Sequence, residues 1–381
     1  MPVGPTPTVT VPIEMPVVIS IAGAFDEQTL GVLDRQIAAF EVANPDVFVQ
    51  VVVPGSTSAF PEEAAAFLAR GETSRDIYVV PAAWVPALVA EGGVLSLNSY
   101  LGQAGLDLTR FFPAAAAAVM YKDEVAALPW TVDGGLLYYR RDILEDLGLA
   151  PPETWQELAE IARQEAGSAD LSYGFVWQGA AYDGLTCNTL EFVWDAGGQV
   201  LDAEGEPAFD TPETVDGLRV MRNLIESGAS PAEVVTFREA AALASFAEGR
   251  ALFMRNWAYA WQRLQAADSG VAGRVGMAPL PASCLGGQVL VLSGSSPNAD
   301  QAFRFMAFLV EYDQQAQIAL GAVQPPALME VYADEELLAQ APVLADLYQG
   351  LLTTRPRPQS PMYAGISEVI YTEVNDMLRG L

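Results

Sequence analysis

Residues 128–142, with the sequence LPWTVDGGLLYYRRD, mark the point at which the character of the chain changes. Within them, the apolar run Leu136–Arg140 is typical of a strand. Before this stretch, strand-like runs alternate with helical patterns. After it, the middle of the chain is mostly helical, until a strand-like run returns at 285–293. The chain therefore divides into two parts of different pattern near residue 130.

The first part shows the strand–helix alternation of a parallel sheet. Strands are predicted at 17–21, 47–53 and 76–80, and the first is apolar except for Ser20, as is typical of a strand buried on both faces. Between the first two, apolar residues recur at the three- and four-residue spacings of a helix: Leu30, Leu33, Ile37 and Phe40. This alternation predicts an α/β fold built from βαβ units.

The composition excludes several classes of function. The chain has 381 residues, of which 19 are Lys or Arg and 48 are Asp or Glu, which gives a net charge of −29. Such a charge repels phosphate backbones, so no nucleic-acid partner is expected. With no histidine and two cysteines, the chain lacks histidine-based catalysis and the ligands of common zinc sites. No metal, cofactor or catalytic residue is predicted, and no apolar run is long enough to cross a membrane.

Residues 1–16 are rich in Pro, Thr and Val and are expected to form an extended tether. No signal peptide is visible in them. Either the protein is cytosolic, or a signal has been removed from an exported form. We favour export, to the periplasm or cell surface, with a lipid anchor on a preceding segment.

Several stretches together resemble the family 1 extracellular solute-binding proteins of ABC importers, and within them the trehalose/maltose-binding branch. The likeness extends over 17–381 in one consistent order. The stretches that carry it are 128–142, 152–158 (PETWQEL), 174–179 (GFVWQG), 182–187 (YDGLTC), 255–261 (RNWAYAW), 276–281, 285–287, 357–361 and 366–370.

The resemblance implies a two-lobe, type II periplasmic-binding-protein-like fold. Each lobe would be a mainly parallel sheet flanked by helices, and the ligand would lie in the cleft between them. The N-lobe is expected to comprise 17–130 and 286–312, and the C-lobe 133–284 and 313–381. The chain would cross between the lobes near 130–133, 284–286 and 312–314.

Aromatic residues at 257–261 are candidates for stacking on sugar rings. The resemblance puts Trp257 and Tyr259 at ligand positions and leaves Trp261 to packing; the alternative is that all three are core residues. Trp130 is a further candidate, with core packing as its equal alternative.

Asp133 interrupts an apolar strand at the expected crossing, where an unpaired carboxylate would be costly. It is therefore either a member of a structural ion pair or a ligand for sugar hydroxyls, and the resemblance favours the second. Arg357 matches the sugar-binding arginine of the family.

Gly286 and Gly287 would let the backbone approach the sugar closely, although a simple turn is the alternative. The next residue, Gln288, would face the cleft, where the branch usually has tryptophan. The N-lobe departs further, because Pro81 stands where the branch carries a sugar-binding aspartate. Trp84 is a candidate substitute on that side.

Cys187 and Cys284 belong to segments that the family layout places near each other in the C-lobe. A disulfide fits an oxidising compartment, and two buried free thiols are the alternative.

The resemblance implies a monomeric binding protein that captures a mono- or disaccharide, or a sugar conjugate, by hinge closure and delivers it to membrane permease subunits. The competing hypothesis is a glycosidase with two carboxylates. No specific pair of carboxylates is indicated, and a calcium-stabilised structural protein lacks the expected loop motif. The protein is therefore predicted not to be an enzyme.

Overall fold

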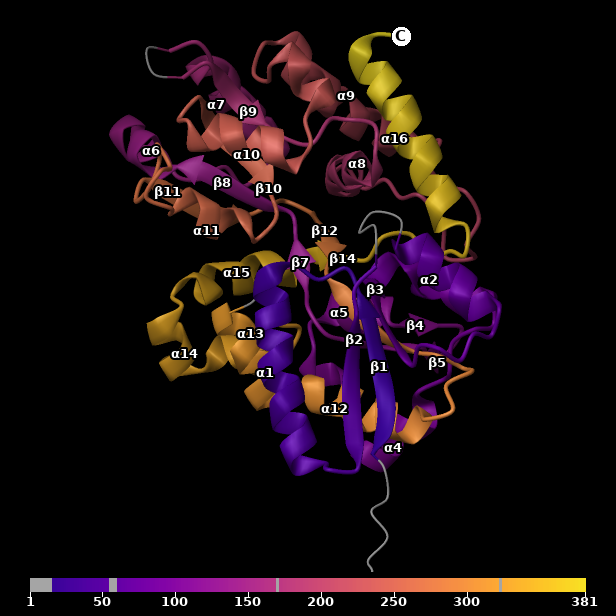
Figure 1. The fold of residues 1–381 in the computed structure, drawn as a ribbon. Coiled ribbons are helices and arrows are strands. Elements are labelled where there is room, and N and C mark those ends of the chain that lie inside the picture. Colours follow the sequence, from indigo (N-terminus) through magenta and orange to yellow (C-terminus); the bar gives the residue numbers. More distant parts are fainter. Residues whose placement is uncertain (1–15, 55–59, 169–170, 322–323) are drawn as a thin grey trace, which may run out of the picture.

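The structure is a computed structural model that describes residues 16–54, 60–168, 171–321 and 324–381. The predicted tether at 1–16 lies, except for Pro16, outside the described residues. Within them, two α/β lobes are joined by a small three-stranded sheet (Figure 1). No helix in this part of the chain is both long and apolar enough to span a bilayer.

The sheet of the first lobe has the strand order β2–β1–β3–β13–β6. Its strands are β1 (Val17–Gly23), β2 (Val47–Val52), β3 (Ile77–Pro81), β6 (Ala127–Pro129) and β13 (Gln288–Leu292). The pairings among β1, β2 and β3 are parallel, as the alternating pattern predicts. Strand β13 runs antiparallel to both β3 and β6, so the sheet is mixed, with the other four strands running in one direction.

Helices and a hairpin surround this first sheet. Helix α1 begins after Asp26, whose carboxylate accepts a hydrogen bond from the Thr29 N–H, and its predicted apolar face packs in the core. The elements of this lobe are α1 (Glu27–Ala43), α2 (Phe60–Ala69), α3 (Val85–Ala90), α4 (Asn98–Ala104), α5 (Pro113–Ala118), β4 (Met120–Tyr121), β5 (Glu124–Val125) and α12 (Ala299–Leu309).

The second lobe has a four-stranded sheet of order β11–β8–β10–β9. Neighbouring strands β9 and β10 pair in parallel, and β8 pairs antiparallel with both β10 and β11. Its strands are β8 (Leu136–Arg140), β9 (Tyr173–Val176), β10 (Ala251–Asn256) and β11 (Val275–Pro279). The helices are α6 (Arg141–Leu147), α7 (Trp155–Glu165), α8 (Asp183–Asp195), α9 (Pro212–Glu226), α10 (Glu239–Ala247), α11 (Ala260–Leu264) and α16 (Tyr363–Arg379).

The connecting sheet consists of β7 (Asp133–Gly134), β12 (Ser283–Gly286) and β14 (Thr354–Arg355). Two of the predicted crossings, near 130–133 and 284–286, coincide with β7 and β12. The predicted strand at 285–293 is divided into β12 and β13 at Gly287, which has a φ of +100°. A Cβ atom there would collide with the carbonyl oxygen of Thr131, so both the conformation and the contact require glycine.

The third predicted crossing, near 312–314, is displaced in the structure. Helix α13 (Tyr312–Gly321) packs against α1 of the first lobe, where the Gln36 Nε2 donates to the Gln314 carbonyl at 2.9 Å. Helices α14 (Glu335–Gln340) and α15 (Val343–Leu352) follow, and the chain then enters β14. Helix α13 therefore lies with the first lobe. Helix α15 contacts β11 of the second lobe, and α16 packs on α8 and α9 of the same lobe.

Candidate functional site: a cleft between the lobes

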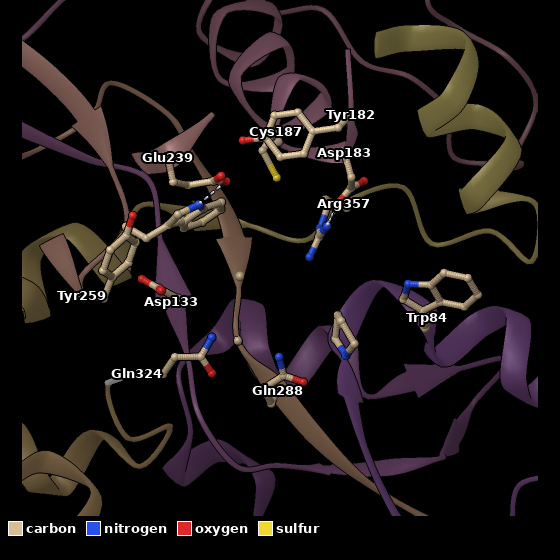
Figure 2. Close-up of a pocket in the computed structure, with 15 residues that line it drawn as sticks. Trp84, Asp133, Tyr182, Asp183, Cys187, Glu239, Tyr259, Gln288, Gln324 and Arg357 are labelled. Atoms are coloured by element: carbon tan, nitrogen blue, oxygen red, sulfur yellow. Dashed lines mark hydrogen bonds and ion pairs between the residues drawn. The ribbon is translucent and has the colours of Figure 1, made fainter. Parts of the chain in front are cut away.

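A cavity of about 360 Å³ lies beside the connecting sheet, between residues of both lobes. Its lining includes every predicted ligand residue except Trp130: Trp84, Asp133, Trp257, Tyr259, Gly286, Gly287, Gln288 and Arg357. Figure 2 shows Tyr182, Glu239 and Tyr259 on the side of the second lobe and Gln288 and Trp84 on the side of the first. The volume lies in the range of small-molecule sites.

Asp133 brings a buried carboxylate to the cavity, and its side chain has no ion pair among the described residues. One oxygen, Oδ1, accepts hydrogen bonds from the N–H groups of Gly134 at 2.8 Å and Ala258 at 3.1 Å. Burial raises the pKa of this carboxyl to about 6, although these N–H groups and Arg255 act in the opposite direction. Asp133 was predicted either to form a structural ion pair or to bind ligand hydroxyls. The described residues give no support for the ion pair.

Replacing Asp133 with asparagine is expected to stabilise the ligand-free protein while weakening the binding of a ligand in the cavity. Between pH 3.8 and about 6 the folded carboxyl holds a proton that the unfolded chain has lost, so wild-type stability falls as pH rises through this window. A neutral amide keeps both backbone hydrogen bonds and avoids this cost. The melting temperature of Asp133→Asn should therefore exceed that of the wild type at pH 8, with the difference closing towards pH 4.

The same variant should bind a hydroxyl-bearing ligand at least about tenfold more weakly at pH 8, because one charge-assisted hydrogen bond is lost. Calorimetry with the ligand that binds the wild type measures this change. A variant that melts much earlier than the wild type and binds with unchanged affinity would show that Asp133 is structural.

Trp257 follows the last residue of β10 and is held from behind by a buried ion pair. The Arg255 guanidinium lies 4.0 Å from the centre of the indole ring, and it pairs with Glu191 at 2.6 Å, with both side chains fully buried. Burial raises the pKa of Glu191, and Arg255 opposes this shift. Because the arginine covers one face of the indole, the ring is fixed in position beside the cavity.

Tyr182, Glu239 and Tyr259 form the part of the lining next to Trp257. Glu239 is the first residue of α10, and its Oε1 accepts a long hydrogen bond of 3.4 Å from the indole Nε1 of Trp257. Burial, with the nearby Glu239 carboxylate, raises the pKa of Tyr259 to about 12 and that of Tyr182 well above the usual value for tyrosine. Both phenols therefore stay neutral hydrogen-bond donors at physiological pH.

Gly286 and Gly287 bring backbone without side chains to the lining of the cavity. A Cβ atom at Gly286 would press on the Trp257 ring and on the Cβ atom of Asp133, each at 3.1 Å, so glycine leaves space beside both. Gln288 faces the cleft (Figure 2), and its N–H donates to the Thr131 Oγ1 at 3.0 Å. An amide thus stands where the family branch usually has an aromatic wall.

Arg357 is 9% exposed and is held by Asp183 at the start of α8. Its Nη1 donates to the Asp183 Oδ2 at 2.6 Å and to the Tyr363 Oη at 3.2 Å. Burial opposes its charge, yet Tyr363 and Asp183 together raise the pKa of Arg357 above its ordinary value. Its positive charge is therefore compensated, and its remaining N–H groups are free to donate to a ligand.

Trp84 and Gln324 complete the lining towards the first lobe (Figure 2). The Thr131 hydroxyl donates to the Gln324 Oε1 at 2.8 Å, which leaves the Gln324 amide N–H groups to the cavity. Pro81 contributes an apolar surface where the family branch carries an aspartate. The first lobe therefore contributes an aromatic ring and side-chain amides to the cavity, and its described lining residues carry no charge.

Trp130 must be corrected as a candidate for sugar stacking. Its side chain is 2% exposed, and its ring packs edge-to-face against Phe25 with the centroids 6.0 Å apart. The alternative of core packing describes its position, because β6 leads the chain into the core just before the crossing.

Cys187 and Cys284 are joined by a disulfide, with Cα atoms 5.4 Å apart. The bond ties α8, which carries Tyr182 and Asp183 at its start, to β12, which leads into the glycine pair. The Cys284 N–H donates to the Glu191 Oε1 at 3.1 Å, so this link also contacts the ion pair behind Trp257.

Four polar lining residues were not predicted: Tyr182, Asp183, Glu239 and Gln324. A signal existed for the first two, because YDGLTC at 182–187 is one of the stretches that carry the resemblance. Glu239 and Gln324 lie at a helix start and in a loop, where no periodic pattern marks them.

Comparison with known proteins gives a family match over most of the chain. Residues 27–316 match the bacterial extracellular solute-binding proteins. The chain belongs to this family. A probable ABC transporter-binding protein of Deinococcus radiodurans is 32% identical over 314 residues, which are 79% of this chain and 72% of that protein.

Solved structures agree in fold over nearly the whole chain. The maltose-bound T. maritima MalE3 is 34% identical, with a TM-score of 0.83 over 95% of this chain and 94% of that one. A Thermotoga lettingae ABC transporter solute-binding protein with bound α-D-tagatose is 25% identical, with a TM-score of 0.80 over 96% and 95%. The family consists of binding proteins that act outside the cytoplasm, and the glycosidase alternative finds no support in it.

Proposed function

We propose that the protein captures a mono- or disaccharide between its lobes and delivers it to the permease of an ABC importer. The observation that carries this proposal is the cavity itself, in which the indole of Trp257 lies next to the buried Asp133 carboxylate and the Gly286–Gly287 backbone. Aromatic faces pack on the C–H surfaces of sugars, and carboxylates and N–H groups bind their hydroxyls. The maltose and α-D-tagatose named for the two solved relatives agree with this class of ligand.

Closure of the lobes would complete the site. Aromatic and charged groups come from the second lobe, while Trp84 and Gln288 come from the first, so a ligand gains both sets of contacts only when the lobes meet. The permease would recognise this closed form. We further propose that the protein acts as a monomer without nucleic-acid partners; a lipid anchor stays a prediction.

A thermal-shift screen of mono- and disaccharides, polyols and sugar conjugates tests the proposal. A ligand raises the melting temperature with the logarithm of its excess over Kd. We expect at least one saccharide to raise it, and chromatography of the incubated mixture to recover that saccharide intact. Release of monosaccharide, or the lack of any shift across all saccharides, would contradict a transport role in sugar uptake.

A further inference from the structure

The charges that line the cavity do not balance. Three carboxylates, those of Asp133, Asp183 and Glu239, face a single guanidinium, that of Arg357. Arg357 is paired with Asp183. Among the residues that the structure describes, neither Asp133 nor Glu239 has a basic group within ion-pair distance. The cavity therefore holds two uncompensated carboxyl groups.

The basic residues closest to Glu239 are engaged elsewhere. Arg255 is fully buried and paired with Glu191 on the far side of the Trp257 indole. Arg238 is exposed, and its guanidinium lies 4.4 Å from the centre of the Tyr182 ring, which it covers. Neither forms an ion pair with Glu239 in the described part of the chain, although Arg238 is its neighbour in sequence.

Aromatic rings surround the Glu239 carboxylate. Trp257, Tyr182 and Tyr259 line the same part of the cavity, and Figure 2 shows both tyrosines beside Glu239. The hydroxyl of Tyr182 is buried and has no hydrogen-bond partner among the described residues. Among the described residues, the Trp257 indole donates a long hydrogen bond to the Glu239 carboxylate, and the Tyr182 phenol lies close enough for this carboxylate to raise its pKa. Neither is a charged partner, so the carboxylate keeps acceptor capacity for a ligand.

A carboxylate among aromatic rings is an arrangement that favours a cation. Ring faces attract ammonium groups, and the attraction grows when water is excluded. The carboxylate adds a charge-assisted hydrogen bond. The whole chain, with its net charge of −29, would also raise the local concentration of cationic solutes and lower that of anions.

We propose that the ligand is an amino sugar whose protonated amine binds against Glu239, within the aromatic pocket of Tyr182, Trp257 and Tyr259. The inference rests on the proposed function, and it narrows the ligand to a saccharide with a positive charge. Asp133, on the other side of Trp257, would receive hydroxyl groups of the same ligand. Sugar acids and sugar phosphates would be rejected, because they would add negative charge to an acidic cavity.

The test compares sugars that differ from their neutral parent in one substituent: an amine, an acetamido group or a phosphate. Glucose, glucosamine, N-acetylglucosamine and glucose 6-phosphate form one set; trehalose and maltose with their 2-amino-2-deoxy analogues form the others. In calorimetry at low salt, each amino sugar that binds should have an affinity at least about tenfold higher than that of the matched neutral sugar. The preference should shrink at high salt, since screening weakens attraction between charges that are not fully buried.

Two matched variants separate the local carboxylate from the overall charge. Glu239→Gln should reduce the amine preference to about twofold or less, because it removes the negative charge and keeps the size of the side chain. Glu213→Gln is the control, because Glu213 also lies in the first turn of a helix, α9, but is exposed and outside the cavity. This control should keep the full preference.

The outcomes distinguish the two proposals. If neutral saccharides bind as tightly as their amines, or if Glu239→Gln weakens both equally, the amino-sugar inference is wrong and the transport proposal stands. If no saccharide of either kind binds, the proposed function fails. Should Glu239→Gln not fold, a wild type with no amine preference at low salt would still overturn the inference, and a preference of at least about tenfold would support it.

Discussion

Replacing Trp257 with alanine is expected to abolish measurable saccharide binding, with a loss of affinity of about a hundredfold or more. The indole lies beside Asp133 and Gly286 in the cavity, and truncation of a central aromatic group costs roughly 2–4 kcal/mol at the centre of a binding site. The fold should persist, because the Arg255–Glu191 ion pair and the Tyr138 hydrogen bond to the Trp257 carbonyl do not need the side chain. Calorimetry with the saccharide identified by thermal shift measures the loss.

Trp261→Ala is the matched control for this experiment. Trp261 is in the next helix, α11, where it packs partly buried against the core and does not line the cavity. Its removal should lower the melting temperature and leave the affinity of the folded protein within about threefold of wild type. Unchanged affinity in a folded Trp257→Ala protein, or equal losses in the two variants, would remove Trp257 from the site.

The sequence predicted the regular elements near the N-terminus well, because each has a complete local signal. In α1 the apolar residues follow the helical period and Asp26 caps the start, and in β1 all residues but Ser20 and Gly23 are apolar. The division at Gly287 corresponds to the turn that was the alternative for the glycine pair, although the sequence also allows one strand over 285–293. Only the approach of Thr131, which is distant in sequence, forces the positive φ that divides it.

The displaced crossing near 312–314 has a similar cause. Helix α13 carries apolar residues that would pack in either lobe, and what decides between them is the tertiary contact with α1. Likewise, β13 and β8 have the pattern of buried strands, but their direction follows from where the chain enters each sheet. Local pattern specifies the type of element and not its direction or partner.

The site could be predicted in part. Asp133 and the glycine pair break an apolar pattern, and such breaks are visible in a single sequence. Glu239 is one of 48 acidic residues, and nothing in its surrounding sequence separates it from the rest. It becomes conspicuous only when the fold brings Tyr182 and Trp257 to it. Trp130, in contrast, was a candidate from the sequence but is buried in the core. A tryptophan next to a crossing between lobes can either line the cleft or pack in the core, and the sequence does not distinguish the two.

Reducing the Cys187–Cys284 disulfide is expected to lower the free energy of unfolding by about 4–5 kcal/mol in the chain-entropy model. The bond closes a loop between residues 97 apart, which greatly restricts the unfolded chain. Urea unfolding with and without reductant measures the difference. Thiol titration of the denatured, unreduced protein should find no free thiol.

Affinity should fall as well when the bond is removed, because Cys187 lines the cavity and Cys284 holds Glu191 behind the Trp257 platform. The double variant Cys187→Ala/Cys284→Ala serves as the control: its unfolding should match that of the reduced wild type and should not respond to reductant. Two free thiols in the unreduced wild type would exclude the bond in solution. If reductant leaves the unfolding free energy of the wild type as unchanged as that of the double variant, the two chain segments are held by packing alone. Breaking a disulfide that closes a loop of this length would increase the entropy of the unfolded chain and so lower the unfolding free energy.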